Sequence, residues 1–246
     1  MAEPLATGIL TALFLLMAVL YSSVGMGGGS GYLAAMALVG LAPENIRLTA
    51  LSLNVVVASI GVWRFSRAGF LAARLWVPFV VASVPAAFLG GALSLPPGVF
   101  RPLLALILLW AATLLWRPVR AEAGEAARPP LVAALASGAG IGVLSGLVGV
   151  GGGIFLAPLL ILRRWATPRS AAATTASFIL ANSLAALAGI STHTRVFSPL
   201  LPLWMGVVAV GGWIGAEMGA RWLSSRALRR ILTIVLVIAG LRMAVG

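Results

Sequence analysis

Apolar segments of two lengths alternate with short polar stretches along the chain. A helix needs about 20 apolar residues to cross the hydrocarbon core of a bilayer. Eight segments approach that length: 5–24, 46–63, 75–93, 100–116, 131–148, 168–190, 200–218 and 232–245. Two others, 29–41 and 154–162, predict short helices that do not cross alone. The pattern therefore predicts an all-α polytopic membrane protein.

Glycines interrupt this pattern twice. The run Ser-Val-Gly-Met-Gly-Gly-Gly-Ser-Gly covers 23–31, and the similar run Ser-Gly-Leu-Val-Gly-Val-Gly-Gly-Gly covers 145–153. Each glycine in a helix interior costs about 1 kcal/mol relative to alanine, so we expect the helices to break here. In lipid, the freed backbone groups are tolerated only where protein or a water-filled cavity receives them. Breaks at matching places in two halves are typical of transporter binding sites.

The two halves of the chain align with each other without any outside sequence. The glycine runs correspond, Pro43 corresponds to Pro168 one residue later, and Asn54 corresponds to Asn182. This is an internal repeat of about 125 residues. We predict a first transmembrane repeat over 1–117, a linker over 118–130 and a second transmembrane repeat over 131–246. Each repeat would hold a glycine-broken first segment followed by three transmembrane helices.

The arginines predict how the repeats lie in the membrane. All 17 basic residues are arginine, against five acidic residues, and the net charge is +12. If each glycine-broken segment crossed once, the two faces would carry eight and nine arginines. If each entered and returned, as a re-entrant hairpin or as paired passes, one face would carry thirteen, and the other would carry only Arg47, Arg101, Arg195 and Arg242. The second arrangement satisfies the positive-inside rule. It predicts inverted-topology repeats, with the linker cytoplasmic and both termini outside.

Composition excludes several function classes. Charged residues make up 9% of the chain, against about 25% in soluble domains. The arginines lie in short loops, so we expect no nucleic-acid partner. The chain has no cysteine, which excludes disulfides and thiolate metal sites, and we expect neither a metal nor a cofactor. His193, the only histidine, falls in a loop, and proton coupling is its alternative role. With no convincing buried carboxylate either, we expect no enzyme. Glu217 lies four residues before Arg221, which predicts a surface ion pair.

Polar residues near the two breaks predict an anion-binding site. Helix N-termini carry a partial positive charge and unpaired N–H groups, which suit anions. Hydroxyl and amide groups add donors without a full cation. The predicted substrate-binding residues are Gly25, Gly27, Gly28, Gly29, Thr49, Ser52, Asn54, Gly149, Gly151, Gly152, Gly153, Thr175, Ser177 and Asn182. A hydrogen bond across helices is the alternative for the two asparagines, and close helix packing is favoured for Gly90, Gly91, Gly211, Gly212 and Gly215.

The paired motifs carry a resemblance to a known family. Val-Gly-Met-Gly-Gly-Gly at 24–29 and Val-Gly-Val-Gly-Gly-Gly at 148–153 are each followed by a short apolar helix, a proline and a span bearing Thr, Ser and Asn. This pattern resembles the sulfite exporter TauE/SafE family over essentially the whole chain. The resemblance implies transport of sulfite, sulfoacetate and related sulfonates, or thiosulfate across a bacterial inner membrane. It also supports the glycine runs as the backbone of the site.

We therefore predict a secondary transporter, acting as an exporter, for a small sulfur-containing anion such as sulfite or an organosulfonate. It would work by alternating access between two inverted repeats. A passive anion channel and a transporter of a non-sulfur organic anion are the alternatives. The expected partners are the anionic substrate and the lipid bilayer. The coupling ion (proton or sodium) and the oligomeric state stay open, as does the choice between re-entrant and paired passes.

Overall fold

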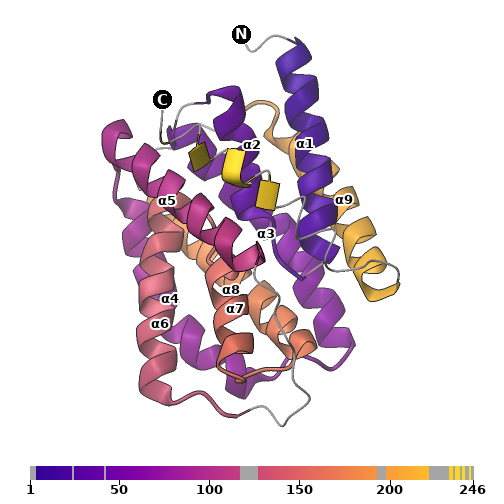
Figure 1. Ribbon diagram of the computed structural model, residues 1–246, viewed down its shortest axis with the longest axis vertical. Helices are drawn as coiled ribbons and strands as arrows, with labels where there is room; N and C mark the ends of the chain where they lie inside the picture. Colours follow the sequence, from indigo (N-terminus) through magenta and orange to yellow (C-terminus); the bar gives the residue numbers. More distant parts are fainter. Residues whose placement is uncertain are drawn as a thin grey trace.

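The computed structural model describes residues 4–23, 25–41, 43–116, 127–192 and 198–221, together with 233, 234, 236–238, 240, 241 and 244. The helices with continuous bounds are α1 Pro4–Ser23, α2 Gly29–Val39, α3 Pro43–Arg67, α4 Ala73–Ala92, α5 Pro97–Trp116, α6 Leu131–Val148, α7 Gly153–Leu162, α8 Pro168–Ile190 and α9 Leu201–Arg221 (Figure 1). Within the described residues, six helices are long and apolar enough to cross a membrane. The predicted all-α membrane architecture is therefore confirmed.

The helix boundaries follow local backbone chemistry. Thr167 caps α8, where its hydroxyl accepts from the Ser170 N–H at 3.4 Å and Pro168 occupies the first turn, as is typical of helix starts. The breaks rely on glycine because Gly28 and Gly152, which precede α2 and α7, have φ values of 95° and 82°. That left-handed conformation costs residues with a Cβ roughly 1–2 kcal/mol.

Each half begins with a long helix that is followed, after the glycine break, by a short one. α2 has 11 residues and α7 has 10, so at a rise of about 1.5 Å per residue each is roughly half as long as the hydrocarbon core is thick. Tyr21 near the end of α1 bonds to Ser30 at the start of α2 at 2.7 Å, and Phe14 packs edge-on against Tyr32. In Figure 1, α1 enters from the top and α6 from the bottom. α2 and α7 are thus too short to cross alone, as predicted.

The long helices α3 and α8 run antiparallel through the centre of the molecule. Leu48 and Leu51 of α3 pack with Ala186 and Ile190 of α8. At the other end, a Cβ on Gly61 would lie 3.2 Å from the Cβ of Ala176. We refer below to the Arg47 end, where α3 begins and α8 finishes, and to the Arg64 end, where α3 finishes and α8 begins.

Equivalent helix contacts recur in the two halves. We call two residues counterparts when they are separated by the repeat length of about 125 residues. α4 packs against α6, where a Cβ on Gly90 would collide with the Val143 carbonyl oxygen. α9 packs against α1, where a Cβ on Gly215 would collide with the carbonyl oxygen of Val19. Gly90 and Gly215 are counterparts, as are Val143 and Val19, and the predicted packing role of both glycines is confirmed.

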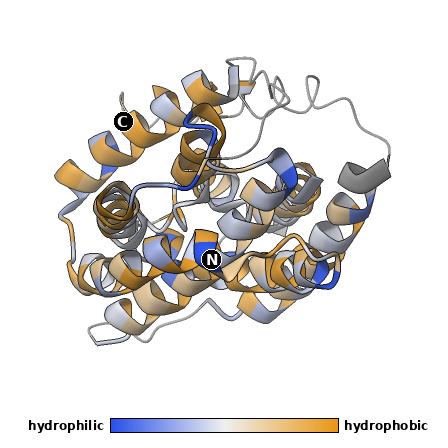
Figure 2. Ribbon diagram, turned by 90° about the horizontal axis from the view of Figure 1, so that it is seen from below, coloured by the Kyte–Doolittle hydropathy of each residue, from blue (hydrophilic) through white to orange (hydrophobic). Residues whose placement is uncertain are grey.

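The outer surfaces are apolar, as a lipid environment requires. Large exposed hydrophobic side chains include Val81, Leu89, Leu106 and Val132 on α4, α5 and α6. Figure 2 shows hydrophobic residues along most of each helix, with hydrophilic colour confined to short stretches. Water cannot satisfy backbone groups in the bilayer core, so the broken backbone between the helices lies inside the protein.

Candidate functional site

The two glycine breaks meet in the interior of the helix bundle. A Cβ placed on Gly29, the first residue of α2, would overlap the carbonyl oxygen of Val150 in the second break. Both residues are buried. We call this meeting point the crossing. Such close approach of two backbones requires glycine, which explains why a run with so little helix propensity occurs inside a membrane protein.

Asn54 of α3 lies in the crossing and contacts both breaks. A Cβ on Gly29 or on Gly151 would lie 2.5 or 2.6 Å from the amide nitrogen of Asn54, and one on Gly27 would lie 3.2 Å from its amide oxygen. The amide donates to the Val150 carbonyl at 3.4 Å. The side chain is fully buried, and its oxygen has no hydrogen-bond partner in the protein. Buried polar atoms normally have partners, so this oxygen, which only accepts hydrogen bonds, is available to a donor such as water.

Ile179 of α8 occupies the position related to Asn54 by the repeat. Cβ atoms on Gly27 and Gly151 would lie 3.0 and 3.1 Å from its side chain, and one on Gly153 would overlap it. Asn54 contacts Gly27, Gly29 and Gly151. If each of these glycines is replaced by its counterpart in the other half, the contacts become those of Ile179. The contacts therefore pair Asn54 with Ile179, and the alignment of Asn54 with Asn182 is wrong by three residues. The crossing thus has an amide on one side and an aliphatic side chain on the other.

Two helix N-termini converge at the crossing. α2 and α7 begin at Gly29 and Gly153, immediately after the left-handed Gly28 and Gly152, and neither start has a side-chain cap. Each terminus carries roughly half a positive charge. Backbone N–H groups at such termini form ready sites for oxyanions. Together with the Asn54 amide they give the crossing donor character without a charged side chain.

The other predicted residues are distributed around the crossing. Thr175 lies beside Gly153, and its buried hydroxyl has no partner in the protein. Ser52 and Ser177 donate to the carbonyls of Leu48 and Ala173 in their own helices, at 2.8 and 3.1 Å, so these hydroxyl protons are engaged.

The remaining positions lie farther out or face other side chains. Thr49 is buried one to two turns before Asn54 on α3, and Asn182 is fully buried beyond Ile179, with neither amide atom bonded. The flanking glycines contact other groups: Gly25 contacts Ala172, Gly149 contacts Arg47, Gly28 contacts Tyr32, and Gly152 contacts Phe178.

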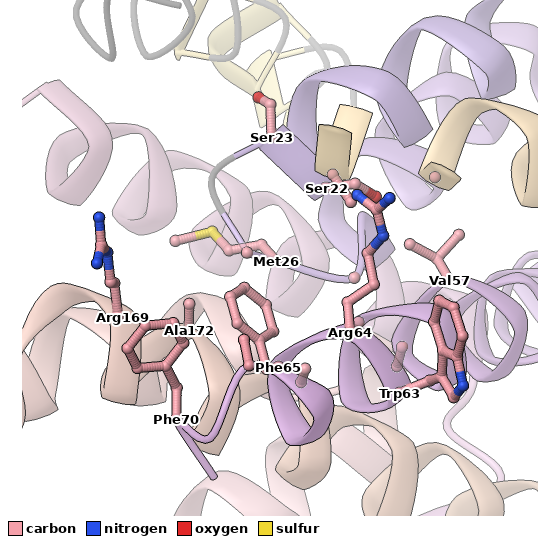
Figure 3. Close-up of a pocket in the computed structure, with 18 of the residues that line it drawn as sticks. Ser22, Ser23, Met26, Val57, Trp63, Arg64, Phe65, Phe70, Arg169 and Ala172 are labelled. Atoms are coloured by element: carbon pink, nitrogen blue, oxygen red, sulfur yellow. The ribbon is translucent and has the colours of Figure 1, made fainter. Parts of the chain in front are cut away.

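A cavity of about 790 Å³ connects the first break to the Arg64 end. Gly25 and Gly27 line it, and Arg64, Arg67 and Arg169 line the same cavity (Figure 3). No acidic residue is among its described lining residues. Clustered charge of one sign in a cleft with low-dielectric walls raises the local concentration of oppositely charged solutes. The cavity is therefore suited to anions.

Aromatic side chains hold these arginines in place. Arg64 lies 4.8 Å over the ring of Trp213, and Arg67 lies 4.8 Å over Trp63. The two tryptophan rings stack on each other at 5.5 Å. Figure 3 shows Arg64 extending from α3 toward Ser22 of α1. Cation–π contacts position a guanidinium while leaving its charge intact.

The structure describes one ion pair that the sequence did not predict. Glu217 of α9 forms an ion pair with Arg64 of α3. The side chain of Arg221 and all of His193 lie outside the described residues. The pair is partly exposed, and such pairs contribute little to stability. The ion pair lies beside the cavity and links α3 to α9.

Sequence reasoning missed Arg47, which it counted as an arginine of the outer face. The side chain is only 6% exposed. Its guanidinium donates to four backbone carbonyls, those of Leu93 at 3.0 Å, Gly90 at 3.2 Å, Gly91 at 3.1 Å and Gly146 at 2.8 Å. The spacing from Pro43 to Pro168, applied to α3 and α8, gives Ala172 and Ile179 as counterparts of Arg47 and Asn54. That spacing was the signal in the sequence from which the counterparts of Arg47 and Asn54 could have been found.

Comparison with known proteins agrees with this architecture. The family described as sulfite exporter TauE/SafE matches residues 10–243. The chain is also 43% identical, over 97% of its length and 98% of the relative, to a protein of Sinorhizobium fredii named "Probable membrane transporter protein y4hK". No solved structure matches the chain. Broken helices that meet inside an apolar bundle, and a family match over nearly all residues, lead to one assignment: this chain is a membrane transporter of the sulfite exporter TauE/SafE family.

Proposed function

We propose that this protein is a secondary transporter of a small sulfur-containing anion, such as sulfite or an organosulfonate. The observation that carries the proposal is the crossing itself, where two uncapped helix N-termini and the Asn54 amide meet at the end of an arginine-lined cavity. Cation pathways usually carry acidic side chains within the membrane. The chain has no aspartate, and Glu217, the one glutamate whose side chain is described, is paired with Arg64.

The arginines and the crossing would act in sequence. Arg67 and Arg169 attract the anion into the cavity, where their charge acts over distances up to roughly the Debye length of 8–10 Å. The charge of Arg64 is compensated by Glu217. At the crossing, backbone N–H groups and the Asn54 amide replace part of the hydration shell of the anion. These neutral donors bind more weakly than a guanidinium would, so release on the other side remains rapid.

The arrangement of the halves supports alternating access between inverted repeats. α3 and α8 are counterparts and run antiparallel, and the contacts of Asn54 and Ile179 exchange when the repeats are exchanged. The cavity extends from the first break to the Arg64 end. The positive-inside rule assigns this end to the cytoplasm. The described conformation would then be the inward-facing one, ready to load an anion for export from the cell.

Flux measurements on the purified, reconstituted protein test this function. Liposomes would be assayed with ³⁵S-labelled sulfite, methanesulfonate and thiosulfate, with acetate as the non-sulfur control. We expect saturable flux of at least one sulfur anion that exceeds acetate flux. Saturable flux of acetate with none of the sulfur anions would identify a different organic-anion transporter. Flux that stays linear with concentration would identify a channel, and either result would overturn the proposal.

A further inference from the structure

Arg47 fastens three helices together on the side of the crossing opposite the cavity. It belongs to α3, and it donates to carbonyls at the end of α4 (Gly90, Gly91) and near the end of α6 (Gly146). The α carbon of Arg47 lies against Gly149, where a Cβ would be 3.1 Å away. Hydrogen bonds from a charged donor are about twice as strong as neutral ones. The guanidinium is therefore the strongest polar link described at the Arg47 end.

The counterpart of this cluster is open space. Gly25 contacts Ala172 as Gly149 contacts Arg47, which makes Ala172 the counterpart of Arg47 by contact as well as by spacing. Ala172 lines the cavity. Two acceptors of the Arg47 guanidinium, Gly91 and Gly146, have Ala216 and Ser22 as counterparts, and both of these also line the cavity. The same position of the two repeats is thus packed with the Arg47 guanidinium at the Arg47 end and lines a cavity at the Arg64 end.

Unpartnered polar atoms lie between Arg47 and the crossing. Asn182 is fully buried and neither of its amide atoms has a partner. It shares a face of α8 with Ile179 at the crossing and with Ala186, which packs against Gly91 beside the guanidinium. Leaving a buried amide unpaired costs about 1–3 kcal/mol per group. Such a cost is reasonable where the amide gains water or a ligand in a second conformation.

We propose that Arg47 is the gate of the Arg47 end: its bonds to α4 and α6 hold that half of the passage closed in the described conformation. When these bonds break, the space around Asn182 opens, as the equivalent space around its counterpart Val57 is open here. This inference rests on the proposed transport function for its purpose. The gate itself is a statement about conformation, so it can be tested without any substrate. Arg47 acts as a positioning residue in this scheme.

The chain contains no cysteine, so accessibility can be measured with single introduced cysteines. Leu51→Cys reports on the Arg47 end, where Leu51 is buried beside Ala186, and Ala176→Cys reports on its counterpart in the cavity. The purified protein would be labelled in detergent with a charged, polar maleimide. With Arg47 intact, we expect rapid labelling of Ala176→Cys and protection of Leu51→Cys.

Replacing Arg47 should reverse the order of the two labelling rates. In Arg47→Ala we expect Leu51→Cys to be labelled about tenfold faster or more, because several charge-assisted bonds are lost, and Ala176→Cys to be labelled more slowly. Arg47→Lys keeps the charge but cannot reach all four carbonyls, and should give an intermediate rate. Arg101→Ala, an exposed arginine at the start of α5, is the matched control and should change neither rate.

A converse variant keeps the proposal testable if Arg47→Ala does not fold. Ala172→Arg places a guanidinium in the cavity at the counterpart position, and we expect it to slow labelling of Ala176→Cys severalfold. Unchanged protection of Leu51→Cys in a folded Arg47→Ala protein would overturn the gate, as would unchanged labelling of Ala176→Cys in Ala172→Arg. Labelling shifts without any sulfur-anion flux would retain the gate and reject the proposed substrate.

Discussion

Ala172 and Ser22 line an open cavity at the Arg64 end, whereas their counterparts Arg47 and Gly146 are hydrogen-bonded to each other at the Arg47 end. The helices that surround the two places are equivalent, and they pack through similar glycine contacts. In the proposed gate, the difference between open and closed is therefore concentrated in one side chain and its acceptors. Two conformations that differ by so few contacts can exchange at modest free-energy cost.

The crossing shows a smaller difference of the same kind. Asn54 and Ile179 contact equivalent glycines, but only Asn54 brings a polar group to them. Both breaks therefore supply backbone N–H donors at the crossing, but only the first half also supplies a side-chain donor. Function should depend on both breaks about equally and on the two asparagines unequally.

The largest expected effect tests whether both breaks are needed. We expect Gly28→Leu to lower sulfite flux by roughly 100-fold, because the left-handed φ of 95° and the collision with Tyr32 together cost several kcal/mol. Gly152→Leu should behave alike, since it meets Phe178 and Ile141. Flux would be measured in liposomes after the amount of folded protein has been matched by size-exclusion chromatography.

Gly140→Leu is the control for these variants, because a Cβ at Gly140 meets nothing within 4 Å. It should transport at the normal rate. If Gly28→Leu impaired transport and Gly152→Leu did not, the equivalence of the two breaks would be broken and the first break alone would form the path.

The next effect separates the two asparagines. We expect Asn54→Ala to raise the Kd for sulfite by about tenfold, since it removes a hydrogen bond to a charged ligand. Asn182→Ala should raise it only about threefold or less, because this residue lies beyond the crossing and makes no direct contact there. Isothermal titration of the purified protein measures both values. An equal loss of sulfite affinity in the two variants would place Asn182 in the binding site, and the two asparagines would then have the same role.

The smallest effect concerns the cavity arginines. We expect Arg67→Gln to raise the KM for sulfite flux roughly threefold at low salt, with kcat little changed, because a rim charge acts mainly on encounter. The difference should vanish at high ionic strength. Arg163→Gln, an exposed arginine that does not line the cavity, should have no effect. A salt-independent loss of kcat in Arg67→Gln would mean that the arginine contacts the anion directly during transport.

Several features of the fold could be predicted from sequence because they are local. The span lengths, the proline starts at Pro43 and Pro168, and the short helices after each glycine run depend on residues close together in the chain. The glycine runs predicted the helix breaks for the same reason, because glycine is a poor helix former. The repeat could be recognised in the sequence because both halves carry a glycine run and a proline at corresponding positions.

Other features depend on the register between helices far apart in the chain. The contact of Asn54 with Gly151, the pairing of Arg64 with Glu217, and the burial of Arg47 join segments separated by many residues. A one-turn shift between α3 and α8 would leave the sequence pattern unchanged and would place another side chain in the crossing. The sequence thus determined where the chain breaks and which groups are freed there, because those are properties of single residues. Only the tertiary structure decided which side chains meet the breaks and which end the cavity reaches, because close packing between distant helices selects one register.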